Sequence, residues 1–194
     1  MIEKTEEERI KAKHIMSDVS VHALYEGTFS VAKDQNFNRI GKNDKPLKGA
    51  LKLSINPFLI RDDKRNILFD AGIGDLFGGD THIGTILGNL EKHGVADFEV
   101  TDIFISHLHF DHMGGLANRS SGYWEPTFPE ADIWVSEDGW RKLEANIEKS
   151  RDEEQEFFYF LNKLDTVRFI GKNDSPIDHV HVECIGGHTE YHYA

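Results

Sequence analysis

One short segment of this chain gathers several residues that bind metals. Residues 107–112 read HLHFDH, and two glycines follow at positions 114 and 115. His107 and His109 stand two positions apart after an apolar run, residues 100–106, that predicts a buried strand. In extended backbone such residues point the same way, so their two imidazoles can converge on one cation. The glycines turn the chain, so the aspartate and the last histidine can face a second cation beside the first.

This mixture of donors indicates a particular chemistry. Imidazole and carboxylate ligands suit Zn²⁺, and also Fe or Mn. A divalent metal lowers the pKa of bound water and polarises the carbonyl or phosphoryl oxygen under attack. Asp111 could both bind the metal and orient the nucleophile, so it is the candidate catalytic residue. A purely structural cluster is disfavoured, because four ligand-type residues fall within six positions between a strand and two glycines.

The segment resembles the H-x-H-x-D-H signature of the metallo-β-lactamase superfamily. Its spelling is most similar to the lactonase-like branch, which includes N-acyl-homoserine lactonases. Two further segments agree with this resemblance. Residues 68–74, LFDAGIG, resemble the strand-end D-x-G element, and residues 186–189, GGHT, resemble the downstream G-H-T element. The resemblance covers the chain from about residue 20 to about residue 190, and it specifies the superfamily far better than the substrate.

The resemblance also implies which residues bind metal. It implies two neighbouring metal sites with these ligands: His107, His109 and His188 at the first, Asp111 and His112 at the second. Asp70 would hold the motif loop or a ligand imidazole without binding metal itself. The alternative for Asp70 is a turn-forming role before Gly72, since Asp-x-Gly is also ordinary turn chemistry.

The chain departs from the family pattern near its end. The family completes the second metal site with a bridging Asp and a further His on later strands, and this chain ends at Ala194 with neither at a matching position. The nearby donors are Glu190 and His192, and we interpret His192 as a surface or capping residue. The expected fold is the αββα sandwich of the superfamily, with an incomplete C-terminal half.

Three explanations of this departure stay open: a fragment of a longer protein, a second chain that supplies the missing strands, or a natural remnant with a degraded site. Missing strands would leave an unpaired sheet edge and exposed apolar surface. We therefore predict a homo-oligomer or a complementing chain.

The remaining patterns predict a mixed α/β domain over residues 19–194, after a charged N-terminal lead-in at residues 1–18. Residues 32–50 are polar and predict a long loop. We expect strands at residues 19–25, 27–31, 51–60, 66–69, 100–106, 133–135, 166–170 and 179–185, with 51–60 and 66–69 forming a hairpin. We expect helices at residues 81–93, from residue 137, and at 152–164, the last with a buried aromatic side.

Composition limits the partners and the compartment. The net charge is −12, with 22 basic against 34 acidic residues among 194, which argues against nucleic acid and weakly against anionic membranes. Cys184 is the single cysteine, so we expect no intrachain disulfide and a reducing, cytoplasmic location. We find no secretory signal and no apolar run of membrane-spanning length.

These observations together predict a metal-dependent hydrolase that acts on a small molecule, with the opening of a lactone ring as the leading reaction. Phosphodiester or organophosphate esters and β-lactams are the alternative substrates. The rival of another class is a non-catalytic metal-binding fragment or interaction protein, which would bind metal without turnover or bind none.

Overall fold

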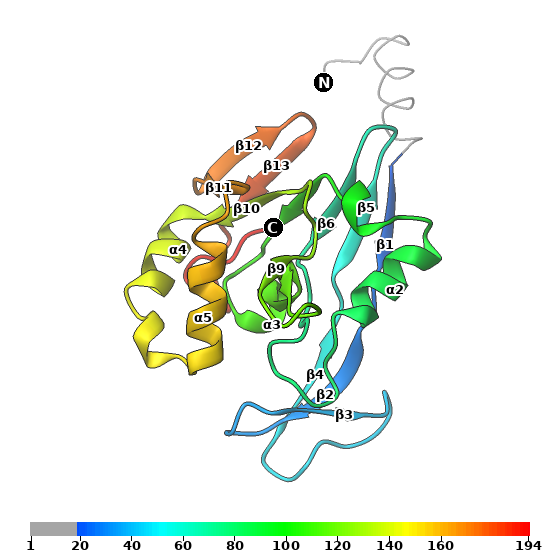
Figure 1. Cartoon of the computed structure of the whole chain (residues 1–194), viewed down its shortest axis with the longest axis vertical. Coiled ribbons are helices and arrows are strands. Elements are labelled where there is room, and N and C mark those ends of the chain that lie inside the picture. Colours follow the sequence, from blue (N-terminus) through cyan, green and yellow to red (C-terminus); the bar gives the residue numbers. More distant parts are fainter. Residues whose placement is uncertain (1–18) are drawn as a thin grey trace, which may run out of the picture.

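The computed structural model describes residues 19–194, and the predicted lead-in at residues 1–18 lies outside them (Figure 1). A six-stranded sheet forms the centre, in the order β1-β5-β6-β7-β10-β11. β1, β5 and β6 are antiparallel neighbours, whereas β6, β7, β10 and β11 run parallel. The strands are β1 Ser20–Ala23, β5 Phe58–Arg61, β6 Asn66–Phe69, β7 Asp102–Phe104, β10 Asp132–Ser136 and β11 Val167–Ile170.

Three smaller sheets surround the central one. A three-stranded antiparallel sheet, β3-β2-β4, extends away from it at the bottom of Figure 1, and the β12–β13 hairpin lies at the top. Their strands are β2 Gly27–Val31, β3 Phe37–Ile40, β4 Leu51–Ile55, β12 Asn173–Ile177 and β13 Val180–Glu183. The third sheet pairs the two short strands β8 Ala117–Asn118 and β9 Glu125–Pro126.

Helices fill the connections between the parallel strands. They are α2 Gly84–Lys92, α3 Phe110–Met113, α4 Glu137–Glu144 and α5 Asp152–Leu161, with 3-10 turns at Asp97–Glu99, Gly114–Leu116 and Ile147–Lys149. α4 begins after Ser136, whose Oγ accepts the Gly139 N–H at 3.0 Å, as a helix N-cap does. α2 is followed by Gly94 at φ 68°, the left-handed conformation that ends helices. Among the described residues, no helix is long and apolar enough to cross a membrane.

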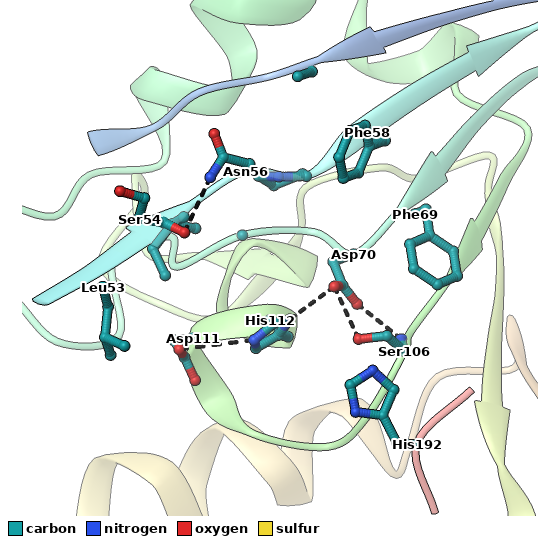
Figure 2. Close-up of a pocket in the computed structure, with 14 residues that line it drawn as sticks. Leu53, Ser54, Asn56, Phe58, Phe69, Asp70, Ser106, Asp111, His112 and His192 are labelled. Atoms are coloured by element: carbon teal, nitrogen blue, oxygen red, sulfur yellow. Dashed lines mark hydrogen bonds and ion pairs between the residues drawn. The ribbon is translucent and has the colours of Figure 1, made fainter. Parts of the chain in front are cut away.

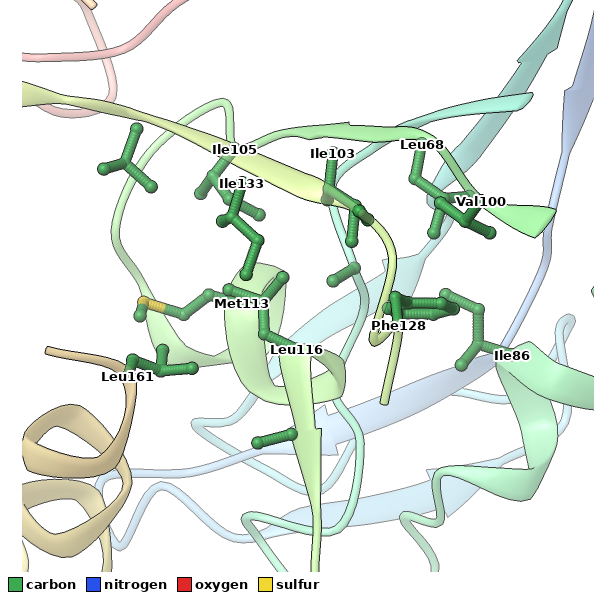
Figure 3. Close-up of a cluster of buried hydrophobic side chains, with 14 of the residues drawn as sticks. Leu68, Ile86, Val100, Ile103, Ile105, Met113, Leu116, Phe128, Ile133 and Leu161 are labelled. Atoms are coloured by element: carbon green, nitrogen blue, oxygen red, sulfur yellow. The ribbon is translucent and has the colours of Figure 1, made fainter. Parts of the chain in front are cut away.

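The main core lies between one face of the central sheet and the helices (Figure 3). Because side chains alternate along a strand, each strand contributes every second residue to this face. The predicted aromatic side of α5 is part of this core, since Phe157 and Phe158 are fully buried. The labelled members of the core in Figure 3 are Leu68, Ile86, Val100, Ile103, Ile105, Met113, Leu116, Phe128, Ile133 and Leu161.

The opposite face of the sheet has a smaller cluster. Ile67, Phe104 and Ile170 pack there against Val182 of the hairpin and Tyr193. Near the β1 edge, the described residues leave this face of the sheet uncovered. Val21 is 60% exposed and Phe58 is 40% exposed there. Exposed apolar surface of this kind is a place where further polypeptide can pack.

Three parts of the sequence prediction are wrong, and all three concern strands. Residues 32–50 are not one loop, because β3 pairs with β2 and Phe37 packs on Phe29 at a centroid distance of 5.7 Å. Residues 51–60 are not one strand, because β4 and β5 belong to different sheets and Asn56 and Pro57 between them belong to neither strand. The proline has no N–H for a ladder, although its carbonyl accepts the Leu24 N–H at 2.7 Å. β12 was also missed, since it contains a proline.

Candidate metal centre

The predicted ligands come from three segments that meet beyond the carboxyl ends of β6 and β7. His107 and His109 lie in the turn after β7, and α3 directly follows with Asp111 and His112. His188 lies in the turn after β13. Loops at the carboxyl ends of parallel strands are a usual place for a site, because the strands fix where each loop begins.

Three of the histidines form a compact group of imidazoles. His107 Nε2 lies 3.1 Å from His109 Nδ1, and His188 Nε2 lies 3.2 Å from the same atom. One nitrogen from each ring lies within 4.8 Å of the other two, so the group could hold a metal ion. The structure therefore brings together the three residues that the resemblance assigns to the first site, although His188 is 79 positions from His109.

The electrostatics of this group fit a cation. Burial lowers the pKa of His107 to about 2, and the neighbouring histidines add to this effect. Burial also lowers the pKa of His109, against the opposing charge of Asp111. The two rings are consequently neutral near pH 7, and neutral imidazole is the form that binds a metal. The residues present therefore fit a divalent metal, with His107, His109 and His188 as its donors.

Asp70 connects the two halves of the predicted motif (Figure 2). Its Oδ1 accepts the Ser106 N–H at 2.8 Å, and its Oδ2 accepts the Ser106 hydroxyl at 2.9 Å. The same Oδ2 lies 2.7 Å from His112 Nδ1, and Ser106 Oγ lies 3.0 Å from His107 Nδ1. This geometry supports the interpretation that Asp70 orients the motif, because its carboxylate reaches two ligand-bearing turns at once.

The carboxylates change the titration of His112. Burial alone lowers the pKa of this ring, but the hydrogen bond and charge of Asp70, with the charge of Asp111, outweigh burial and raise it. His112 Nε2 also lies 3.8 Å from Asp111 Oδ2. The two residues predicted for a second metal are thus side by side, while the group of three mutually close donors consists of His107, His109 and His188.

A cavity of about 470 Å³ opens beside these residues (Figure 2). Asp70, Asp111 and His112 form its polar side. Its other side is mostly apolar, with Ser54 and Asn56 as polar exceptions. The apolar residues come from β4, β5, their junction and β6: Leu53, Ile55, Pro57, Phe58 and Phe69. A mostly apolar cleft with a few converging polar groups is the usual form of a small-molecule site.

His192 contributes more to the centre than the sequence indicated. Its ring lies nearly parallel to that of His107, with centroids 4.8 Å apart and an interplanar angle of 16°, and it also lines the cavity. Its Nδ1 is buried and has no hydrogen-bond partner among the described residues. The Tyr193 N–H donates to the Ser106 carbonyl at 2.8 Å and so holds this segment against the motif. In the sequence, the spacing of four positions between His188 and His192 was the feature that could have indicated this role.

Comparison with known proteins gives the family. The profile of the Metallo-beta-lactamase superfamily matches residues 51–194. The chain belongs to the metallo-beta-lactamase superfamily. The family and the fold class expected from the motif are therefore confirmed. No curated protein sequence matches the chain.

Several solved structures have the same fold. A probable metal-dependent hydrolase from Staphylococcus aureus has a TM-score of 0.67 and 23% identity, covering 91% of this chain and 67% of its own. The hydrolase AbOPH of the beta lactamase superfamily has a TM-score of 0.67 and 26% identity, with 91% and 66% covered. AidC, a dizinc quorum-quenching lactonase, has a TM-score of 0.67 and 22% identity, with 90% and 66% covered. The chain thus spans about two thirds of the length of these proteins, whose names support the predicted enzyme class, a hydrolase.

Proposed function

We propose that this chain is a metal-dependent hydrolase that opens the ester ring of a lactone. The observation that carries the proposal is the group formed by His107, His109 and His188, whose donor atoms lie within 4.8 Å of one another. Asp111 and His112, from the same motif, line the neighbouring cavity. Zinc is the metal that we propose, because neutral imidazoles in a closed group of three suit it and leave room for a further ligand.

The residues of the centre have separate roles in this proposal. The three imidazoles hold the metal, and Asp111 and His112 would contribute to a second one. When bound, a divalent metal makes water more acidic and polarises an ester carbonyl. Asp111 lines the cavity and would accept a hydrogen bond from the attacking water, which orients it. Asp70 keeps His112 in one tautomer through the 2.7 Å contact at Nδ1.

The cavity and the charge favour a lactone with an apolar substituent. The wall formed by Leu53, Ile55 and Phe58 would pack against an acyl chain while the ester faces Asp111. A net charge of −12 disfavours an anionic substrate such as a phosphodiester, because like charge lowers its local concentration. The lactonases among the structural neighbours agree with this choice, and a dizinc lactonase is one of them.

The proposal extends to the assembly and the compartment. The exposed apolar side chains near β1, among them Val21 and Phe58, favour a homo-oligomer or a complementing chain. Light scattering of the purified chain tests this, since a monomer at all concentrations would contradict it. The single cysteine, Cys184, favours a reducing compartment, the cytosol.

Metal analysis combined with a hydrolysis assay tests the proposed function. Elemental analysis of protein purified without chelator gives the metals per chain, and the same protein is assayed with an N-acyl lactone, a phosphodiester and a β-lactam. We expect one or two metals per chain and preferential lactone opening, lost on chelation and restored by zinc. His107→Ala should lose both metal and activity. His181→Ala is the matched control, because among residues 19–194 the side chain of that exposed histidine bonds only Ser175, at 3.0 Å on the β12–β13 hairpin. Metal without turnover would favour the non-catalytic alternative, and no metal after reconstitution would overturn the proposal.

A further inference from the structure

Glu26 is a buried carboxylate that no sequence motif predicted. It lies between β1 and β2 and is only 2% exposed. Its Oε2 accepts the Ile73 N–H at 2.9 Å, and its Oε1 is buried without a hydrogen-bond partner among the described residues. Burial raises the pKa of Glu26 to about 7, against the opposing effects of the Ile73 N–H and the charge of Arg39. A residue so costly to bury needs a structural reason.

The partner of Glu26 is the segment 70–74, which lies between Glu26 and the metal-binding motif. On the motif side the Asp70 N–H donates to the Phe104 carbonyl at 2.8 Å, and the Ala71 N–H donates to the His112 carbonyl at 2.8 Å. On the other side the segment rests on the Glu26 carboxylate through the Ile73 N–H.

The contact with Glu26 is close enough to restrict the sequence of that segment. A Cβ at Gly72 would lie 2.2 Å from Glu26 Oε2, and Gly72 also has φ 74°, which side chains disfavour. Asp70 has φ 64°, a left-handed conformation that is strained for a residue with a side chain. Strained backbone persists only where the surroundings hold it.

We propose that Glu26 is a positioning residue of the metal centre: by accepting the Ile73 N–H it fixes the segment 70–74 so that the Asp70 carboxylate reaches Ser106 and His112. This inference rests on the proposed function, because it concerns the same metal centre. Glu26 itself touches neither the metal donors nor the cavity, so it acts through Asp70. The segment needs an oxygen that can accept the Ile73 N–H, and both the charged and the protonated carboxyl of Glu26 provide one.

Two substitutions separate this role from bulk packing. Glu26→Gln keeps an acceptor oxygen for the Ile73 N–H, whereas Glu26→Leu keeps much of the volume and removes it. Thr28→Val is the matched control, because Thr28 is equally buried two residues away and its hydroxyl bonds Tyr25 and Ser54 instead of the segment 70–74. Zinc affinity is measured for each full-length protein by competition with a chromogenic chelator.

We expect Glu26→Leu to bind zinc about tenfold more weakly than the unsubstituted chain, since residues that orient ligands change metal affinity by roughly 10–100-fold. Glu26→Gln should bind zinc with an affinity within about twofold of that of the unsubstituted chain, a difference well below the roughly 10–100-fold range. Equal zinc affinity of Glu26→Leu, Glu26→Gln and Thr28→Val would overturn the inference. If Glu26→Leu does not fold, Glu26→Asp, which is too short to reach the Ile73 N–H, takes its place with the same expectation.

A second readout without metal separates this inference from the proposed function. In the metal-free protein, NMR of the His112 ring detects its hydrogen bond to Asp70 as a deshielded Nδ1 proton. We expect this signal in the unsubstituted chain, Glu26→Gln and Thr28→Val, and its loss in Glu26→Leu. Persistence of the signal in Glu26→Leu would contradict the inference even if the chain binds zinc. Absence of zinc binding by the unsubstituted chain would contradict the proposed function alone.

Discussion

The metal centre has two groups of residues. The first group is His107, His109 and His188, whose rings contact one another, and His107 also contacts the Ser106 hydroxyl. In the second group, His112 is bonded to the carboxylate of Asp70 and lies beside the carboxylate of Asp111. Burial lowers the pKa of His107 and His109 in the first group. In the second group the carboxylates overcome burial and raise the pKa of His112. The difference shows that one motif can shift the pKa values of its imidazoles in opposite directions when a carboxylate is hydrogen-bonded to only one of them.

This difference has a consequence for metal binding. Burial keeps His107 and His109 of the first group neutral near pH 7, so a cation displaces no proton from these two rings. The raised pKa of His112 means that Asp70 and Asp111 favour its protonated form, and that form competes with metal binding. We therefore expect the three-histidine group to bind a metal more tightly than Asp111 and His112 do. Four experiments test this expectation.

His107→Ala removes the ring that contacts both other members of the first group and His112. We expect zinc affinity to fall more than about 100-fold, beyond the range typical of residues that only orient ligands, and lactone opening to fall to background. Chelator competition and the lactone assay measure this, with His181→Ala as the unchanged control. An affinity within about tenfold of the unsubstituted chain would show that the first group is not the main metal site.

Asp70→Asn removes the charge that distinguishes the second group while keeping the size of the side chain. We expect the pKa of His112 to fall below its present raised value, so that the two groups become alike, and zinc affinity to fall roughly 10–100-fold. NMR titration of the metal-free protein follows the His112 ring directly. A pKa of His112 that stays raised would assign the effect to Asp111 instead.

The stability of the metal-free protein should depend on pH in opposite directions for the two groups. The pKa of His107 is about 2 when folded, so below pH 6.5 the unfolded chain binds a proton that the folded chain does not. Stability then falls with falling pH by at most about 1.4 kcal/mol per pH unit for this proton. The raised pKa of His112 stabilises the fold below pH 6.5, and this contribution is lost as pH rises through the folded value.

Urea unfolding of the metal-free protein between about pH 5 and 8 measures the free energy of unfolding against pH. The acidic arm of this curve is the loss of stability with falling pH, and the alkaline arm is the loss with rising pH. Asp70→Asn should flatten the alkaline arm, and His107→Phe should flatten the acidic arm. Retention of the acidic arm in His107→Phe would show that another group, such as His109, is responsible for it.

His192→Phe is expected to have the smallest effect. The substitution keeps a flat ring for stacking on His107, at the observed centroid distance of 4.8 Å, and removes both nitrogens. If His192 serves by packing, zinc affinity should change less than about threefold, well short of the 10–100-fold loss expected when an orienting residue is removed. A loss comparable to that of His107→Ala would instead place His192 among the metal donors and join the two groups into one.

The sequence alone was sufficient for features whose partners are near in the chain. His107, His109, Asp111 and His112 fall within six positions, so strand geometry and one turn are enough to bring them together. The start of α4 at residue 137 was predictable for the same reason, because the Ser136 side chain and the N–H three residues later are close once a helix begins.

Only the tertiary structure decided contacts between distant segments. Asp70 reaches Ser106 because β6 and β7 are parallel neighbours, and strand order follows from the packing of the whole sheet. The same holds for His188 beside His109 and for Glu26 beneath Ile73. Alternation along a strand tells which side chains share a face, but it carries no information on which strand lies next to it. The apolar residues spread over 51–60 therefore did not reveal that β4 and β5 belong to two sheets, and the packing of distant elements determined this separation.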